Sequence, residues 1–169
     1  NDVAETLAQQ AVEALIVVNA SPYETHKDSK RMAGAQGCID IAGVPLVYVN
    51  QVGGQDELVF DGHSFILNPD GHAPYRSEAC REQCDTVRLE HAPNTGNWLI
   101  ERAPVHTPMD ENEAVYEALM LGLRDYVTKN GFPGVIIGLS GGIDSALTAA
   151  LAVDALAPES VRCVMMPSP

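Results

Sequence analysis

The sequence is poor in basic and in aromatic residues. Ten Lys and Arg stand against 23 Asp and Glu, which gives a formal net charge of −13 at pH 7. Such a charge repels a phosphate backbone, so we expect no binding to nucleic acid. It does not exclude nucleotides, because backbone amides and a metal ion can hold phosphates locally. Aromatic residues make up only 5%, yet 46% of the residues are hydrophobic, which is enough for a buried core.

The sequence also lacks long apolar runs, a secretory leader and paired cysteines. Without about 18 consecutive apolar residues we expect no membrane-spanning helix. The four cysteines form no CxxC pair, and two neighbouring thiols are too few for a zinc site. They are Cys38, Cys80, Cys84 and Cys163. These features favour a cytoplasmic protein with reduced thiols, and the absence of an initiator Met suggests a segment of a longer chain.

The first ninety residues alternate between strand and helix patterns. Short β-branched runs at 15–18 and 45–51 predict buried strands, and an exposed helix is expected over 25–36. The pair Asp61-Gly62 predicts a hairpin turn. We expect the acidic side chains near it to face solvent, namely those of Asp56, Glu57 and Asp61.

The second half has a different pattern. Residues 91–110 are rich in Pro, Asn, Thr and Gly and predict a linker. Asp110 can cap a helix with Glu113 three residues on, and Gly131 can end that helix. A buried strand over 135–137, a helix over 146–156 and another buried strand over 161–166 then predict a βαβ crossover.

The loop between that strand and helix carries the strongest chemical signal. Its residues are Gly138, Leu139, Ser140, Gly141, Gly142, Ile143, Asp144 and Ser145. Backbone amides are unpaired at a helix start and favour an anion. The glycines allow a phosphate to approach, and the serines add hydroxyl donors. Asp144 would repel phosphates unless a cation lies between them, and Mg²⁺ is the cation that accepts carboxylate and phosphate oxygens together.

A Walker loop would supply a lysine to the β- and γ-phosphates, and this loop has none. It resembles the PP-loop of the N-type ATP pyrophosphatases, in which a substrate oxygen attacks the α-phosphate of ATP and pyrophosphate leaves. A plain Gly-Gly turn with Asp144 and Ser145 as helix caps is the structural alternative. The resemblance implies a Rossmann-like adenine nucleotide α-hydrolase fold with a parallel sheet, and ATP and Mg²⁺ as cofactors.

Two segments upstream of the loop indicate which family of PP-loop enzymes the sequence resembles. Residues 15–27 and 47–71 resemble the later part of a nitrilase-like glutaminase domain; they read LIVVNASPYETHK and VYVNQVGGQDELVFDGHSFILNPDG. A nitrilase-like domain ahead of a PP-loop is the arrangement of the glutamine-dependent NAD synthetase family. The resemblance implies an α/β chain: the C-terminal part of a nitrilase-like α-β-β-α sandwich over 1–90, a linker over 91–110, and the start of the PP-loop domain over 111–169.

The family resemblance also implies the chemistry. Glutamine is hydrolysed at one site, ammonia passes to a second site, and there ATP adenylates the carboxylate of deamido-NAD⁺, which ammonia converts to NAD⁺. Ser21 and Lys27 match glutamine-binding positions. The glutaminase Glu, Lys and Cys are expected upstream of Asn1, so no catalytic residue is assigned here, and residues for deamido-NAD⁺ are expected after Pro169. A homo-oligomer is implied as well.

Two other functions remain open at this stage. The loop also suits another PP-loop ligase that amidates or thiolates a different acceptor. A nucleotide-binding or interface segment without activity of its own would carry the same residues. On the residues alone, Ser21 could simply stabilise a turn and Lys27 could be a solvated charge.

Overall fold

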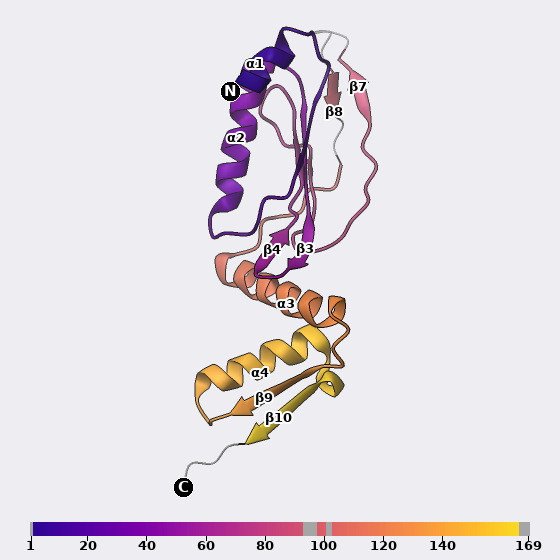
Figure 1. Ribbon diagram of the computed structural model, residues 1–169. Coiled ribbons are helices and arrows are strands. Elements are labelled where there is room, and N and C mark those ends of the chain that lie inside the picture. Colours follow the sequence, from indigo (N-terminus) through magenta and orange to yellow (C-terminus); the bar gives the residue numbers. More distant parts are fainter. Residues whose placement is uncertain (1, 93–97, 101–102, 166–169) are drawn as a thin grey trace. The chain divides into compact units, whose positions relative to one another are not determined.

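A four-stranded mixed sheet organises the first half of the chain in the computed structural model, which describes residues 2–92, 98–100 and 103–165 (Figure 1). The strand order is β1-β2-β5-β6, with β1 and β2 parallel and the other two pairs antiparallel. The strands are β1 Leu15–Asn19, β2 Leu46–Asn50, β5 Phe65–Leu67 and β6 Tyr75–Arg76. This sheet belongs to one compact unit, Asn1–Val52 with Asp61–Met109. The other unit is Gly53–Phe60 with Asp110–Pro169.

Helix α2, Lys27–Ala42, covers one face of this sheet, and helix α1, Asp2–Ala8, packs against α2 (Figure 1). Successive strand residues point to opposite faces, so alternate residues of β5 enter two separate clusters. Phe65 and Leu67 pack with Ile39 of α2, whereas Ile66 packs with Tyr75 on the far face. The fold is therefore an α/β layer whose main core lies between α2 and the sheet.

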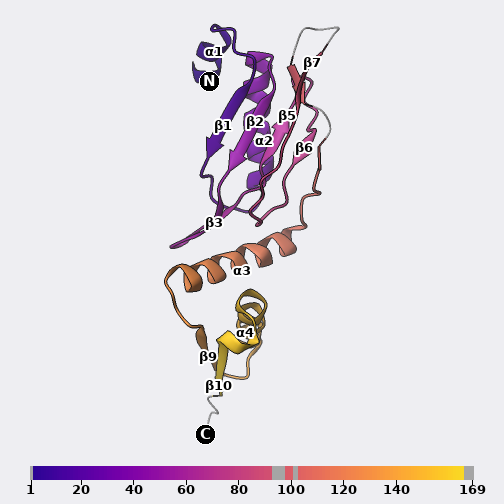
Figure 2. The ribbon, with the colours of Figure 1, turned by 90° about the vertical axis from the view of Figure 1, so that its right-hand side faces the viewer.

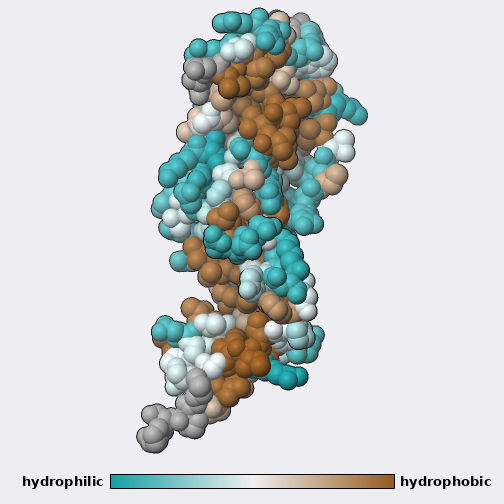
Figure 3. Space-filling view, viewed as in Figure 1, coloured by the Kyte–Doolittle hydropathy of each residue, from teal (hydrophilic) through white to brown (hydrophobic). Residues whose placement is uncertain are grey.

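The predicted burial of residues 15–18 is only half right. Leu15 is buried against α2, but Ile16 and Val18 are 71% and 79% exposed. Figure 2 shows β1 at the edge of the sheet with α2 behind it. The side chains of β1 alternate between the two faces of the sheet. In the part of the chain described, nothing covers those that point away from α2. Such apolar surface is visible in brown on both units in Figure 3.

The helix predicted over 25–36 is longer and less exposed than expected. It begins at Lys27 and continues to Ala42, and Gly43 ends it with a positive φ of 66° and an amide bonded to the Ile39 carbonyl. Three of its side chains are buried: Arg31, Ala35 and Ile39. Cys38, which we expected after the helix, lies within it and packs against the main core.

The hairpin turn predicted at Asp61-Gly62 is wrong. Strand β3, Val52–Gln55, pairs with β4, Leu58–Asp61, so the turn lies between them at residues 56–57. Within the second unit this hairpin packs on helix α3, Glu111–Lys129. The Gly54 amide donates to Asp125 Oδ2 at 2.7 Å, and Lys129 Nζ donates to the Gly54 carbonyl at 2.7 Å.

The predicted linker over 91–110 contains ordered contacts with the first unit where it is described. Strand β8, Trp98–Ile100, pairs antiparallel with β7, Leu89–His91. Ile100 is buried against Ile66, and its amide and carbonyl bond the side chain of Asn68. A Pro- and Asn-rich composition did not reveal this docking, because the partners lie about thirty residues away in sequence.

Helix α3 follows the sequence prediction closely. The Asp110 carboxylate accepts hydrogen bonds from the amides of Asn112 and Glu113 at 2.9 and 3.0 Å, as an N-cap should. The helix ends at Lys129, and Gly131 adopts a positive φ of 69° immediately after it. The predicted start and stop are therefore confirmed.

The predicted crossover is also confirmed. Strand β9, Val135–Leu139, pairs in parallel with β10, Val161–Met165, and helix α4, Ile143–Leu156, connects them; a short 3₁₀ turn, Pro158–Ser160, precedes β10. The predicted burial of the first of these strands is wrong, since Ile136 is 73% exposed. Within the described residues a helix packs on only one face of β9 and β10, so the side chains on the other face are uncovered. Met166, the expected strand end, lies outside the described residues.

Candidate functional site

The predicted phosphate loop lies at the junction of β9 and α4. The helix begins at Ile143, three residues earlier than the sequence suggested, and Gly142 is its N-cap with φ −84° and ψ 161°. Gly141 adopts a φ of 86°, a left-handed conformation that favours glycine. The structure therefore places residues 138–145 across a strand end, a tight turn and the first turn of a helix.

Two hydroxyls face each other across this turn. Ser140 Oγ lies 3.3 Å from Ser145 Oγ. The Ser140 hydroxyl also accepts from the Gly142 amide at 3.4 Å, and the Ser145 hydroxyl donates to the Gly142 carbonyl at 3.0 Å. These contacts hold the loop in shape and bring both serines to the same side of the turn.

The loop leaves room for a phosphate. A Cβ added to Gly141 would meet nothing within 4 Å, and one added to Gly142 would lie 3.6 Å from Ser140 Oγ. No side chain caps the N-terminus of α4, so its first amides remain available for an anion. This donor set fits a nucleotide phosphate.

Asp144 lies in the first turn of α4 and is exposed. Among the described residues no group of three or more His, Cys, Asp or Glu could enclose a metal ion. A single carboxylate beside phosphate oxygens nevertheless fits Mg²⁺, which usually keeps several waters and binds through one or two carboxylates plus phosphates.

Ser21 and Lys27 lie at the second predicted site. Ser21 follows β1 at the end of the parallel pair, and Lys27 is the first residue of α2. Lys27 Nζ donates to Glu24 Oε1 at 2.5 Å, and this contact lowers the pKa of the Glu24 carboxyl. The carboxyl ends of parallel strands commonly form binding sites, so both residues occupy a suitable edge.

Three buried residues that the sequence did not indicate surround Ser21: Asn50, Arg31 and Asp61. The amide of Ser21 donates to Asn50 Oδ1 at 2.8 Å, and Arg31 Nε donates to Ser21 Oγ at 3.2 Å. Asp61, expected in solvent, is 6% exposed and forms an ion pair with Arg31. The sequence signal for these contacts was weak, because Arg31 and Asp61 are thirty positions apart in segments of ordinary charged composition.

A second polar cluster lies beside this one and includes His63. Arg76 Nε donates to His63 Nε2 at 3.0 Å, and His63 Nδ1 lies 3.4 Å from Asp28 Oδ1. Asp28 also forms an ion pair with Arg76. Burial, followed by the positive charge of Arg76, lowers the pKa of His63 below its usual 6.5. A neutral imidazole suits this geometry, because its Nε2 already accepts a hydrogen bond.

We expect His63 to make the first unit less stable at mildly acidic pH. Its pKa is lower in the folded state, so the unfolded chain binds the proton first and folding stability falls as the pH drops below about 6.5. His63→Asn should reduce this loss, and Asn tolerates the positive φ of 54°. Urea unfolding followed by the fluorescence of Trp98 gives the free energy of unfolding at pH 7.5 and at pH 5.5. If this free energy falls equally between the two pH values in both proteins, the prediction is wrong.

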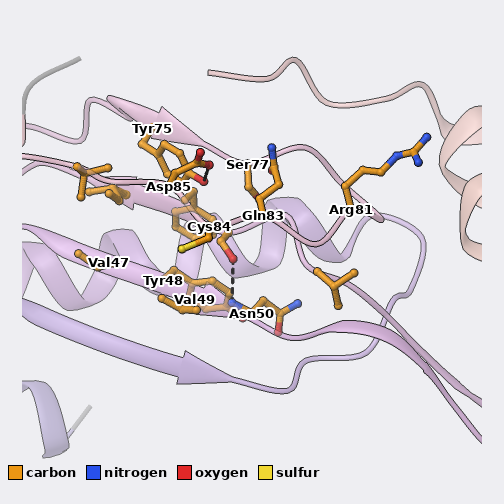
Figure 4. A pocket seen from close by; sticks show the side chains of 15 residues that line it. Val47, Tyr48, Val49, Asn50, Tyr75, Ser77, Arg81, Gln83, Cys84 and Asp85 are labelled. Carbon is orange, nitrogen blue, oxygen red and sulfur yellow. Dashed lines mark hydrogen bonds between the residues drawn. The ribbon is translucent and has the colours of Figure 1, made fainter. Parts of the chain in front are cut away.

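The first unit also contains a cavity of about 310 Å³ on the sheet face opposite α2 (Figure 4). Val47 and Ile66 contribute apolar lining, and the Tyr75 hydroxyl donates to Asp85 at 2.6 Å on one side. Burial and this bond raise the pKa of Tyr75. Asn50, which holds Ser21, also lines the cavity.

Neither the cysteines nor the helices suggest a further site in the described residues. None of the four cysteines, all of which lie in described parts of the chain, is in a disulfide, and only Cys80 is buried. In the described ranges no helix combines the length and apolarity that crossing a bilayer requires.

Comparison with known proteins agrees with this architecture. The family model described as NAD synthase matches residues 115–169. The chain is 45% identical to glutamine-dependent NAD(+) synthetase of Rhodobacter capsulatus over 167 residues, covering 99% of this chain and 30% of that protein. The Acinetobacter baylyi enzyme of the same name is 43% identical over 95% of this chain and 29% of its own length.

Solved structures give the same result. Glutamine-dependent NAD⁺ synthetase from Acinetobacter baumannii, solved in complex with ADP, matches with a TM-score of 0.88 and 40% identity, over 98% of this chain and 31% of that one. A Cytophaga hutchinsonii protein of that name shares the fold at 22% identity and a TM-score of 0.64, covering 90% of this chain and 25% of its own.

Fold and comparisons together define an α/β protein of the NAD synthase class, with mixed and parallel sheets. More narrowly, the chain belongs to the glutamine-dependent NAD(+) synthetase family. It spans about 30% of the length of the curated relatives it matches.

Proposed function

We propose that the protein containing this chain makes NAD⁺ from deamido-NAD⁺ with ATP and glutamine. The observation that carries the proposal is similarity over 99% of the chain, at 45% identity, to a relative of that name. In the proposed reaction the substrate carboxylate attacks the α-phosphate of ATP and pyrophosphate leaves. Ammonia from glutamine then displaces AMP, so that the products are NAD⁺, AMP, pyrophosphate and glutamate.

Each half of the chain has a proposed place in that enzyme. Residues 1–90 form the C-terminal part of a nitrilase-like α-β-β-α sandwich, 91–110 connect, and 111–169 begin the PP-loop domain. The mixed sheet covered by α2 supports the first assignment, and the loop between β9 and α4 supports the second. The protein is proposed to act in the cytoplasm as a homo-oligomer.

ATP phosphates are proposed to bind the loop over 138–145. The uncapped amides at the start of α4 would bind phosphate oxygens. The hydroxyls of Ser140 and Ser145, which here contact each other and the Gly142 carbonyl, would turn to donate to the bound phosphate. Asp144 would hold Mg²⁺, which neutralises charge on the phosphates. The ADP in the Acinetobacter baumannii relative supports a nucleotide site in this family.

Ser21 and Lys27 are proposed to bind glutamine. Both lie at the carboxyl edge of the parallel pair β1 and β2, and Lys27 supplies a positive charge for a carboxylate. The glutaminase Glu, Lys and Cys are proposed to lie upstream of Asn1. The positions of the four cysteines agree with this, because none of them lies at the end of β1 or β2.

Substrate-dependent ATP–pyrophosphate exchange tests the proposal. The complete gene product should exchange label when deamido-NAD⁺ is added, because adenylation of its carboxylate is reversible. Xanthosine monophosphate and aspartate should not stimulate exchange. Exchange with either would indicate another PP-loop ligase, and no exchange with any acceptor would indicate a binding or interface role instead.

A further inference from the structure

Ser21 is held by two buried side chains at three of its polar atoms. Asn50 Oδ1 accepts from the Ser21 amide at 2.8 Å, and Asn50 Nδ2 donates to the Ser21 carbonyl at 3.1 Å. Arg31 Nη2 donates to the same carbonyl at 2.7 Å, and Arg31 Nε donates to the hydroxyl oxygen at 3.2 Å. A turn that only had to reverse the chain would not require so many bonds to buried groups.

Arg31 is itself fixed by Asp61. Its two terminal nitrogens donate to the two carboxylate oxygens at 2.9 and 2.8 Å, and only 3% of its side-chain surface is exposed. This bidentate pairing orients the planar guanidinium, so Nε can point only toward Ser21. The carbonyl of Pro22 accepts a further bond at 3.1 Å, which ties α2 to the turn after β1.

The direction of the Arg31–Ser21 hydrogen bond has a chemical consequence. A guanidinium N–H only donates, so Ser21 Oγ must be the acceptor and its own proton stays available. Within the described part of the chain no group accepts that proton, and Ser21 is half-buried rather than enclosed. The Ser21 hydroxyl therefore has its proton available for a hydrogen bond to another oxygen.

Lys27 adds to this preference. It lies four residues before Arg31 in α2, which places both on the same face of the helix. A hydroxyl donor and an ammonium group both favour a carboxylate or carbonyl oxygen over an ammonium group of a ligand. The anchoring of α2 by Arg31 thus sets the position of Lys27 as well as that of Ser21.

We infer that Arg31 is a positioning residue for the glutamine site: paired with Asp61, it directs the Ser21 hydroxyl to donate to an oxygen of the substrate. The inference rests on the proposed function, because it takes glutamine as the ligand. It adds two residues, Arg31 and Asp61, that do not touch the substrate but set its affinity through Ser21.

The test is NAD⁺ formation from deamido-NAD⁺ by the complete gene product, with glutamine or ammonia as nitrogen donor. Arg31→Lys keeps the charge but loses the planar fork, so the KM for glutamine should rise about tenfold while kcat changes less. The ammonia-supported rate depends on the other site and serves as the internal reference. Ser21→Ala should raise the KM for glutamine by a similar factor.

A double variant separates positioning from general weakening of the fold. If Arg31 acts through Ser21, adding Arg31→Lys to Ser21→Ala should produce almost no further rise in KM. The matched control is Ile39→Val in the same helix, a buried core change that makes none of these bonds and should leave the glutamine KM unaltered. If Arg31→Lys does not fold, Asn50→Ser removes the other anchor of Ser21 and should show the same KM effect.

Three outcomes decide the matter. A selective KM rise that vanishes in the Ser21→Ala background supports the inference. An unchanged KM in Arg31→Lys, or an equal rise in both backgrounds, overturns it while leaving the proposed function intact. If the unsubstituted protein makes no NAD⁺ even with ammonia, the proposed function fails instead, and the glutamine assignment fails with it.

Discussion

Replacing Asp144 with Ala should abolish Mg·ATP-dependent exchange of pyrophosphate by the complete gene product. The carboxylate is exposed in the first turn of α4, beside uncapped amides, where a metal ion can bridge it to phosphates. Loss of one preorganised electrostatic contact in a transition state costs about 3 kcal/mol or more, so the rate should fall at least on the order of 100-fold. Deamido-NAD⁺-stimulated exchange at saturating Mg²⁺ measures the effect.

Asp154→Asn is the matched control for this change. Asp154 lies on the same helix near its other end and is exposed, where its carboxylate accepts a bond from the Tyr116 hydroxyl at 2.7 Å. It should retain normal exchange, because it is more than two helical turns from the loop. Full activity in Asp144→Ala would refute the metal role and leave Asp144 as an ordinary helix-start residue.

Asp61→Asn should strongly destabilise the first unit. The substitution keeps the shape of the side chain but leaves the buried guanidinium of Arg31 without its counter-charge. Removing one partner of a buried ion pair typically costs about 3–5 kcal/mol. Urea unfolding of this 169-residue segment, followed by the fluorescence of Trp98, the one tryptophan in this sequence, should show a lower midpoint.

Asp40→Asn provides the comparison. Asp40 is an exposed residue of α2 whose carboxylate accepts a bond from Gln36 at 2.7 Å, so its loss should cost roughly 0.5 kcal/mol or less. A similar midpoint for the two variants would mean that the Arg31–Asp61 pair contributes little to folding. In that case the site inference would depend on the KM measurements alone.

Much of the second unit could be predicted because its signals are local. Asp110 caps α3 through amides two and three residues away, and Gly131 ends the same helix with a positive φ. The loop between β9 and α4 likewise depends on neighbours, since Ser140 and Ser145 contact each other across a five-residue separation. Burial in this unit could not be predicted, because an apolar strand residue such as Ile136 is covered only if another element packs on it.

In the first unit, by contrast, the important contacts join residues far apart in the sequence and could not be predicted. The composition around Asp61-Gly62 favoured a turn in solvent, yet Asp61 is buried at the end of β4 and the turn lies at 56–57. Its partner Arg31 is thirty positions earlier, within a charged run that suggested an exposed surface. A charged side chain is buried only when its counter-charge lies beside it, and that depends on how the fold of the first unit brings Asp61 to Arg31.

By itself, therefore, the sequence determined the α/β character, the crossover, the helix caps and the glycine- and serine-containing loop that precedes α4. These features depend on backbone conformation and hydrogen bonds between residues close in the chain. Only the tertiary structure decided which charges are buried, which strand faces stay exposed and which side chains hold Ser21. Those properties depend on contacts between segments that are distant in the sequence. A local sequence pattern does not predict which distant segments come together.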